Sequence, residues 1–222
     1  KEEEQEEEQE EEQKILGVVW NTKKDKLSVA IEEEKYKEEA TTPRHVVQQQ
    51  AALFDPLGIV APFHLLGRQW TQKAMDGRWG WDLEIKEEVK IGFNEWTSSI
   101  VELKDLSIDR SWDDVETVGG QEQLHIFADA STTGYGAVVY RRVIGKKGKI
   151  RVSFICGKSH VVPANSSRSS HHGSIPRLEL VSALKGVDLL RAVSKSIRNR
   201  IKDVVFWIDS NCVLTQIRDR KS

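Results

Sequence analysis

Short apolar runs stand out in the C-terminal half of the chain, and two of them end in an aspartate. The run 124–128 is followed by Asp129, and the run 204–208 is followed by Asp209. Between them, apolar residues recur every three or four positions, which predicts an amphipathic helix over about 176–200. Because a strand, a helix and a second strand follow one another, we expect the two strands to pair in parallel within one sheet.

Two more strands are predicted between the first aspartate and this helix. Residues 137–143 and 150–156 are rich in β-branched residues and are bounded by glycine-containing turns. Short turns favour antiparallel neighbours, so three antiparallel strands should precede the helix. Residues 160–175 are rich in Ser and predict a loop. From about residue 121 onward we therefore expect an α/β (α+β) fold, a mixed sheet with flanking helices.

The N-terminal half predicts a hairpin followed by helices. Strands are expected at 14–20 and 27–31, on either side of a polar turn. A Thr-Pro step predicts the start of a helix over 42–54. Two further helices are expected at about 62–75 and 84–103, the second from a stripe of large apolar residues at helical spacing.

The chain thus divides into three predicted segments. Residues 1–13 are almost all Glu and Gln and form an acidic low-complexity tail. Residues 14–118 form the smaller hairpin-plus-helices domain, and residues 119–222 form the mixed-sheet domain. Because the chain begins with Lys rather than Met, we expect it to be a fragment of a longer protein.

The formal net charge of −2 conceals a strong asymmetry between the two halves. Residues 120–222 contain 18 Lys and Arg against 7 Asp and Glu, whereas residues 1–119 contain 15 against 28. A basic half indicates a polyanionic partner such as nucleic acid, the alternative being an ordinary solvated surface. Two cysteines make no disulfide framework, and no apolar run is long enough to span a bilayer.

Three carboxylates stand out because acids are rare in the basic half. Asp129 and Asp209 follow the two apolar strands, and Glu179 falls in the first turn of the helix between them. This order can bring three carboxylates to one point, where they would repel one another without a cation. Hard divalent ions, Mg²⁺ or Mn²⁺, would relieve that repulsion. Ser131 and Ser210 have no histidine placed to activate them, so we expect a hydrogen-bonding role for both.

Several ungapped blocks occur in an order that resembles the ribonuclease H domain of retroelement polyproteins. The resemblance is closest to the BEL/Pao class of LTR retrotransposons, in the region known as the Pao retrotransposon peptidase family. It runs from about Lys14 to the end of the chain and is carried by the blocks Leu53–Pro62, Phe127–Ser131, Tyr135–Tyr140, Arg177–Leu180 and Trp207–Ser210.

This resemblance implies a ribonuclease H-like fold, preceded by a thumb- and connection-like segment of a reverse transcriptase. It implies metal-dependent hydrolysis of the RNA strand of RNA–DNA hybrids, with Asp129, Glu179 and Asp209 as catalytic residues and Mg²⁺ or Mn²⁺ ligands. The family carries a fourth carboxylate on a later helix, and this chain ends before it, so we expect activity to be impaired. The implied partners are nucleic acid and the upstream reverse transcriptase and downstream integrase parts of the same polyprotein. The implied location is intracellular, in the cytoplasm or a virus-like particle, and not a membrane.

Six basic residues are candidates for holding phosphates. Arg177 lies two positions before Glu179 and is the best candidate near the site, the alternative being a salt bridge. The others lie on the predicted second strand and in the basic turn after it: Arg141, Arg142, Lys146, Lys147 and Lys149.

Two other functions remain open. The chain could be a non-catalytic nucleic-acid-binding or structural remnant of the polyprotein. An aspartic peptidase, which the family name suggests, is disfavoured because it needs Asp followed by Thr or Ser and then Gly, and no such triplet occurs.

Overall fold

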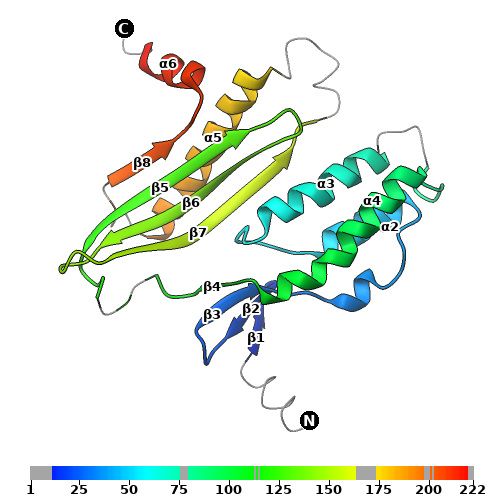
Figure 1. Ribbon diagram of the computed structural model, residues 1–222, viewed down its shortest axis with the longest axis horizontal. Helices are drawn as coiled ribbons and strands as arrows, with labels where there is room; N and C mark the ends of the chain where they lie inside the picture. The colour runs from blue at the N-terminus through cyan, green and yellow to red at the C-terminus, as the bar shows by residue number, and fades with distance from the viewer. Residues whose placement is uncertain are drawn as a thin grey trace. The chain divides into compact units, whose positions relative to one another are not determined.

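The computed structural model describes residues 12–75, 80–112, 114, 116–163, 174–197, 201 and 203–219. The chain divides into two compact units, Lys1–Ser111 and Trp112–Ser222 (Figure 1). Trp112 and Asp114, assigned to the first domain by sequence, hydrogen-bond within the second unit, to Arg141 and Arg151. The predicted acidic tail up to residue 11 and the loop at 164–173 lie outside the described residues.

The first unit contains a four-stranded sheet in the order β1-β2-β3-β4. All neighbours are antiparallel, and the strands span Glu12–Ile15, Val18–Asn21, Lys26–Val29 and Ser107–Asp109. The prediction of one strand over 14–20 is wrong, because Leu16 and Gly17 adopt positive φ angles of 49° and 80° and turn the chain back on itself. Residues 107–109, for which the sequence predicted no element, form β4 and pair with β3.

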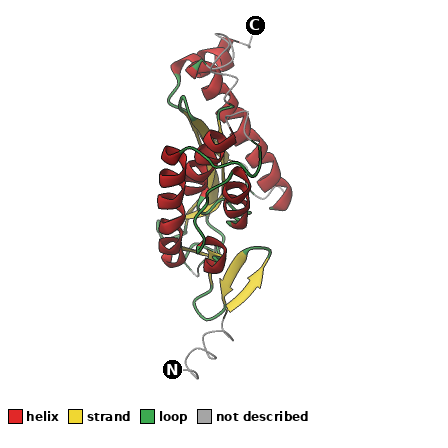
Figure 2. Cartoon of the chain, turned by 90° about the vertical axis from the view of Figure 1, so that its right-hand side faces the viewer, coloured by secondary structure: helices red, strands yellow, loops and turns green. Residues whose placement is uncertain are grey.

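The described part of the first unit also contains five helical segments, which span Glu33–Tyr36 (η1), Pro43–Ala52 (α2), Ala61–Met75 (α3), Glu87–Ser98 (α4) and Ser99–Asp105 (η2) (Figures 1 and 2). The predicted start of α2 is confirmed, because the Thr42 hydroxyl accepts a hydrogen bond from the backbone N–H of His45 at 3.3 Å. The helix predicted over 84–103 is shorter, and its last turns continue as the 3₁₀ segment η2. Phe93, Leu53 and Ile100 are fully buried in the core of this unit.

A buried histidine joins α3 to the loop that precedes it. The His64 ring is 6% exposed; its Nε2 lies 2.5 Å from the carbonyl oxygen of Leu53, and its Nδ1 lies 3.2 Å from Nε2 of Gln50. The neutral ring satisfies both contacts by donating to the carbonyl and accepting from the amide. Burial lowers the pKa of His64, because the charged ring would lose its hydration.

The second unit contains a four-stranded sheet in the order β7-β6-β5-β8. Its strands span Gln121–Ala130 (β5), Gly134–Ile144 (β6), Ile150–Val161 (β7) and Asp203–Trp207 (β8). β5, β6 and β7 are antiparallel, and β8 is parallel to β5, with Phe127 opposite Trp207. This confirms the predicted mixed sheet and the predicted parallel pairing of the two acid-terminated strands.

One face of this sheet is covered by α5, which spans Ile175–Ser196 (Figure 1). Leu124 and Ile126 of β5 point to this face and are almost completely buried against apolar residues of the helix. The approach is close at Gly186, where an added Cβ would lie 2.8 Å from Cγ2 of Ile126 and 2.5 Å from Cζ of Phe206. The short helix α6, Asn211–Asp219, follows β8.

The two edges of the second sheet differ in charge. β7 carries Arg151 and Lys158, and such charges discourage pairing with another chain. β8 reads Asp-Val-Val-Phe-Trp and, within the described residues, pairs only with β5. We therefore expect this 222-residue chain to self-associate through β8.

Val205→Lys should weaken self-association about tenfold, because a lysine on an unpaired edge opposes strand pairing. Sedimentation velocity over a concentration series measures the effect. Val152→Lys, on the charged edge β7, is the matched control and should leave association unchanged. A chain that stays monomeric at high concentration would contradict the prediction.

The buried histidine should make folding pH-dependent. A lowered pKa in the folded state means that the stabilisation is complete above the ordinary histidine pKa of about 6.5 and is lost as the pH falls through the folded-state value. Thermal unfolding between pH 8 and pH 5 should show this loss, and His64→Gln should reduce it. His45→Gln, a substitution in α2, should follow the wild-type profile; equal slopes in all three chains would exclude His64 as the cause.

Candidate active site

The parallel pairing places the two strand-terminal aspartates at the same edge of the sheet. β5 and β8 run side by side with Phe127 opposite Trp207, and each aspartate lies two residues beyond this pair. Both aspartates are exposed. One carboxylate oxygen of Asp129 accepts a hydrogen bond from the backbone N–H of Ala130 at 2.7 Å.

Glu179 is the fifth residue of α5, just beyond the first turn in which the sequence predicted it, and is half-buried. Its Oε2 accepts a short hydrogen bond from the hydroxyl of Ser210. Ser210 is 6% exposed, and its oxygen also accepts from the backbone N–H of Val213 at 3.3 Å, which caps α6. The expectation that Ser210 has a hydrogen-bonding role is confirmed by these contacts.

The three carboxylates do not form a metal-binding group in this conformation. Among the described residues, no three His, Cys, Asp or Glu side chains are placed to hold a metal ion together. Strand alternation puts Asp129 on the face of Phe127, whereas α5, which bears Glu179, covers the face of Ile126. The oxygen ligands suit Mg²⁺ in kind, but the three side chains do not fit the ion in their present positions.

One predicted nucleic-acid contact is structural instead. Arg141 is 4% exposed; its Nη2 lies 2.9 Å from Oε1 of Glu122, and its Nη1 donates to the carbonyl oxygen of Trp112 at 2.8 Å. The strand pattern explains this, because Arg141 alternates with half-buried positions of β6 and points to the covered face, like Val139 and Val143. A guanidinium buried in this way cannot reach a phosphate at the surface, so the assignment of Arg141 is corrected.

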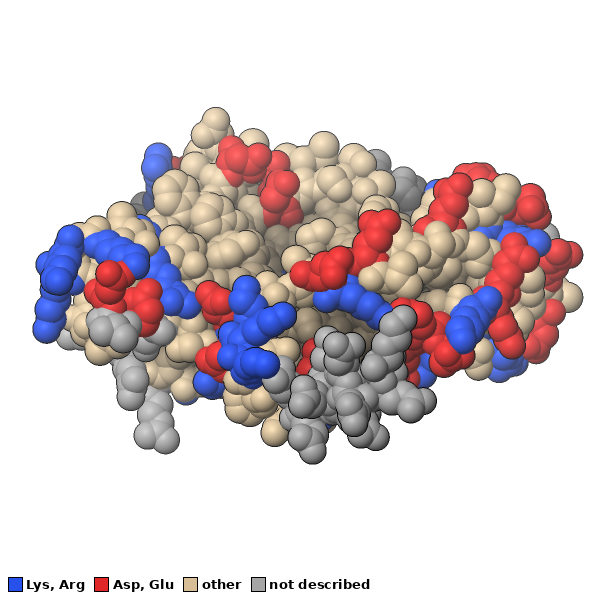
Figure 3. All heavy atoms as spheres, turned by 60° about the horizontal axis from the view of Figure 1, so that its bottom comes forward, with Lys and Arg blue, Asp and Glu red and all other residues tan. Residues whose placement is uncertain are grey.

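The other predicted contacts lie nearer the surface. Lys146 and Lys147 are exposed in the turn between β6 and β7, and the neighbouring Lys149 pairs with Glu116. Arg142 is half-buried and donates to the side chain of Gln123, and Arg177 is exposed in the first turn of α5. Figure 3 shows both basic and acidic side chains gathered at the end of the second unit that holds the β6–β7 turn.

An aromatic cluster on the uncovered face was not predicted from the sequence. The ring of Trp207 stacks on Phe127 with centroids 5.8 Å apart, and its Nε1 donates to Nδ1 of His125 at 3.0 Å. Edge-to-face contacts carry the cluster on to Tyr140 and Phe154. The signal in the sequence was weak, because each strand contributes only one of these rings, Phe127, Tyr140, Phe154 or Trp207, to the face opposite the core.

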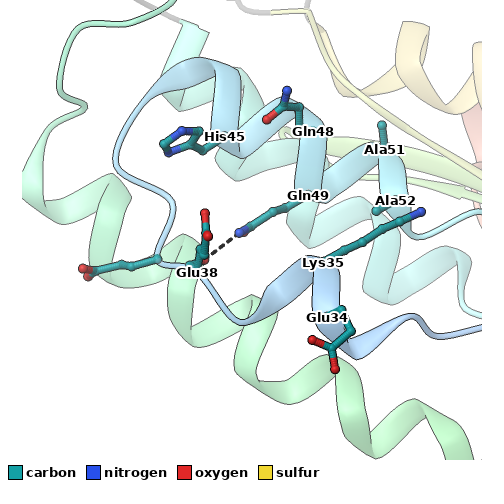
Figure 4. A pocket seen from close by; sticks show the side chains of 9 residues that line it. Glu34, Lys35, Glu38, His45, Gln48, Gln49, Ala51 and Ala52 are labelled. Carbon is teal, nitrogen blue, oxygen red and sulfur yellow. Dashed lines mark hydrogen bonds between the residues drawn. The ribbon is translucent and has the colours of Figure 1, made fainter.

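The first unit contains a separate pocket of about 680 Å³. It is formed mainly by the segment after β3 and by α2, and Figure 4 shows the amide of Gln49 reaching across it to the carbonyl oxygen of Glu38, at 2.7 Å. The pocket contains none of the predicted site residues; its lining is Glu34, Lys35, Glu38, Glu39, His45, Gln48, Gln49, Ala51 and Ala52.

The second unit has the arrangement of a ribonuclease H-like domain: a mixed sheet, a parallel pair ending in two aspartates, and a crossing helix that carries an acid. A family model described as the Pao retrotransposon-like RNaseH-like domain matches residues 42–210. The chain belongs to this family. The match includes most of the first unit, so the region that defines the family extends beyond the second unit.

Other comparisons are more distant. No curated protein matches the chain. Similar solved structures include the foamy viral protease-reverse transcriptase dRH in complex with dsDNA, at 15% identity and a TM-score of 0.44, covering 95% of this chain and 34% of that one. The foamy viral protease-reverse transcriptase with dsDNA gives 15% and 0.43, covering 94% and 38%. The same enzyme with an RNA/DNA hybrid gives 18% and 0.41, covering 96% and 26%.

The chain thus spans about a third of the length of these viral proteins, and TM-scores below 0.5 support no functional argument. None of the described helices is long and apolar enough to cross a membrane.

The buried ion pair leads to a stability prediction. Arg141→Met should destabilise the chain by about 3 kcal/mol, because it leaves Glu122 without its buried partner. Arg142→Met, one position along the same strand, removes a hydrogen bond from a half-buried side chain and should cost less than about 1 kcal/mol. Urea unfolding measures both changes, and equal losses would show that Arg141 has no special structural role.

Proposed function

We propose that this chain is a nuclease domain of a Pao-type retrotransposon polyprotein, which cleaves the RNA strand of RNA–DNA hybrids with Mg²⁺ or Mn²⁺. The observation that supports the proposal is the parallel β5–β8 pair, which brings Asp129 and Asp209 to one sheet edge in a chain of this family. Bound divalent ions activate water and stabilise the leaving oxygen in such chemistry.

In this proposal Asp129, Glu179 and Asp209 are the metal ligands. Since these side chains are not grouped in the described conformation, they must move together when metal and hybrid bind. Carboxylate side chains change rotamer far faster than enzymes turn over, so this side-chain motion would not limit the rate of cleavage.

The basic surface supplies the contacts to nucleic acid in this proposal. Lys146 and Lys147 are exposed in one turn, and Arg177 is exposed two residues before Glu179. Phosphate contacts of this kind give affinity without sequence preference, and selection for RNA would come from its 2′-hydroxyl groups. The proposed neighbours in the polyprotein are a reverse transcriptase, of which the first unit would be the thumb- and connection-like end, and an integrase.

A second candidate function is binding of nucleic acid without cleavage. The separation of the three carboxylates favours this function. If the metal site never assembles, the basic surface can still bind nucleic acid, but no cleavage follows. The two functions make different predictions for a single substitution at Asp129.

Asp129→Asn should abolish cleavage of a hybrid labelled on its RNA strand, because it removes one of the proposed metal ligands. Affinity for the uncleaved hybrid in EDTA should stay within about twofold, because one exposed charge contributes little to phosphate contacts. Denaturing gels measure cleavage, and fluorescence anisotropy measures affinity.

Asp188→Asn is the matched control, since Asp188 is a surface acid of α5 paired with Lys185. It should cleave like the wild type. Hybrid binding without any cleavage by the wild-type chain, in either metal, would favour the non-catalytic function.

A further inference from the structure

The hydrogen bond between Ser210 and Glu179 joins two parts of the proposed site. Glu179 is the fifth residue of α5, whereas Ser210 directly follows Asp209 and directly precedes α6. The bond therefore ties an acid of the covering helix to the residue beside a strand-terminal aspartate. At the same time the three acids are not grouped.

We propose that Ser210 is a latch that holds Glu179 out of the metal site in the free chain. The inference rests on the proposed function, because it takes Glu179 to be a metal ligand in the active state. In the free chain Glu179 serves as an acceptor for the Ser210 hydroxyl, and it becomes a metal ligand only after that bond is broken.

Ser210 is held in place by its contacts with α6. The residue is 6% exposed, its hydroxyl oxygen accepts from the N–H of Val213, and its carbonyl oxygen accepts from the N–H of Leu214 at 3.0 Å. With its oxygen already an acceptor for the cap of α6, the hydroxyl hydrogen is left to point at Glu179. The serine cannot follow the carboxylate without uncapping the helix.

The strength of the bond sets the size of the effect. A neutral donor to a carboxylate is among the stronger hydrogen bonds of proteins, and Glu179 must give it up to move toward the aspartates. Loss of the donor should therefore favour the released carboxylate by about tenfold in a metal-binding equilibrium. If Glu179 already bound the metal in the free chain, loss of the Ser210 hydroxyl should leave the metal affinity unchanged.

The test is a Mn²⁺ titration of the ¹⁵N-labelled 222-residue chain, followed by paramagnetic broadening of the amide signals of Ala130 and Ser210, or of the residue substituted at 210. Site-resolved signals are needed because the Glu-rich N-terminal residues offer other binding sites for the ion. Ser210→Ala should reach half-broadening at about tenfold lower Mn²⁺ concentration than the wild type. Ser210→Thr retains the hydroxyl and should behave as the wild type.

Two further variants isolate the carboxylate. Glu179→Gln in the otherwise unchanged chain should leave Mn²⁺ affinity unaltered, because Glu179 is not a ligand in the latched state. The same substitution added to Ser210→Ala should remove the tenfold gain. Ser182→Ala is the control, since the Ser182 hydroxyl donates to the backbone oxygen of Glu179 and not to its side chain.

The outcomes separate the latch from the proposed function. Mn²⁺ binding that is unchanged or weakened in Ser210→Ala, or weakened in Glu179→Gln alone, would overturn the latch while leaving the metal site in place. The Glu179→Gln result decides the question even if Ser210→Ala does not fold. Absence of broadening near Ala130 and Ser210 in every chain would overturn both the latch and the metal-dependent function.

Discussion

The parallel pairing of β5 with β8 is the constraint on which the second unit depends. Parallel neighbours cannot be joined by a tight turn, so the chain must cross from one end of the sheet to the other, and α5 makes that crossing. The crossing helix must pack closely, and Gly186 permits it to lie directly on Ile126 and Phe206. Burial of one face, the placement of Glu179 and the common edge of the two aspartates all follow from this connection.

The same connection explains why the acids are near one another along the sheet edge without forming a group. The strands set the positions of the two aspartates, whereas α5 sets the position of Glu179. The sheet and the helix are different layers of the unit. In this conformation the hydroxyl of Ser210, which lies after β8, donates a hydrogen bond to the carboxylate of Glu179. Backbone topology thus brings the residues to one region, and side-chain contacts decide whether they meet.

Much of the fold could be predicted from the sequence because its signals are local. The apolar strands, the Thr-Pro start of α2 and the stripe of α5 each depend on neighbours in the chain. The errors had one local cause and one longer-range cause. The strand expected over 14–20 is broken by a local turn at Leu16 and Gly17. Arg141, in contrast, is held on the covered face by Glu122, which lies diagonally across on the neighbouring strand. The Ser210 contact joins residues 31 apart and left no pattern in the sequence beyond a serine beside an aspartate.

The stacked rings on the uncovered face have a spectroscopic consequence. Trp207 contacts Phe127 and donates to His125 across the parallel pair, so its indole senses whether β8 is docked on β5. Burial and the nearby charge of Arg142 lower the pKa of His125, which keeps its Nδ1 available as an acceptor at neutral pH. The chain contains seven tryptophans, so the contribution of this indole to the emission and the near-ultraviolet dichroism is the difference between the wild type and Trp207→Phe. That difference is an optical reporter of the docking of β8, the strand that Asp209 follows, on β5.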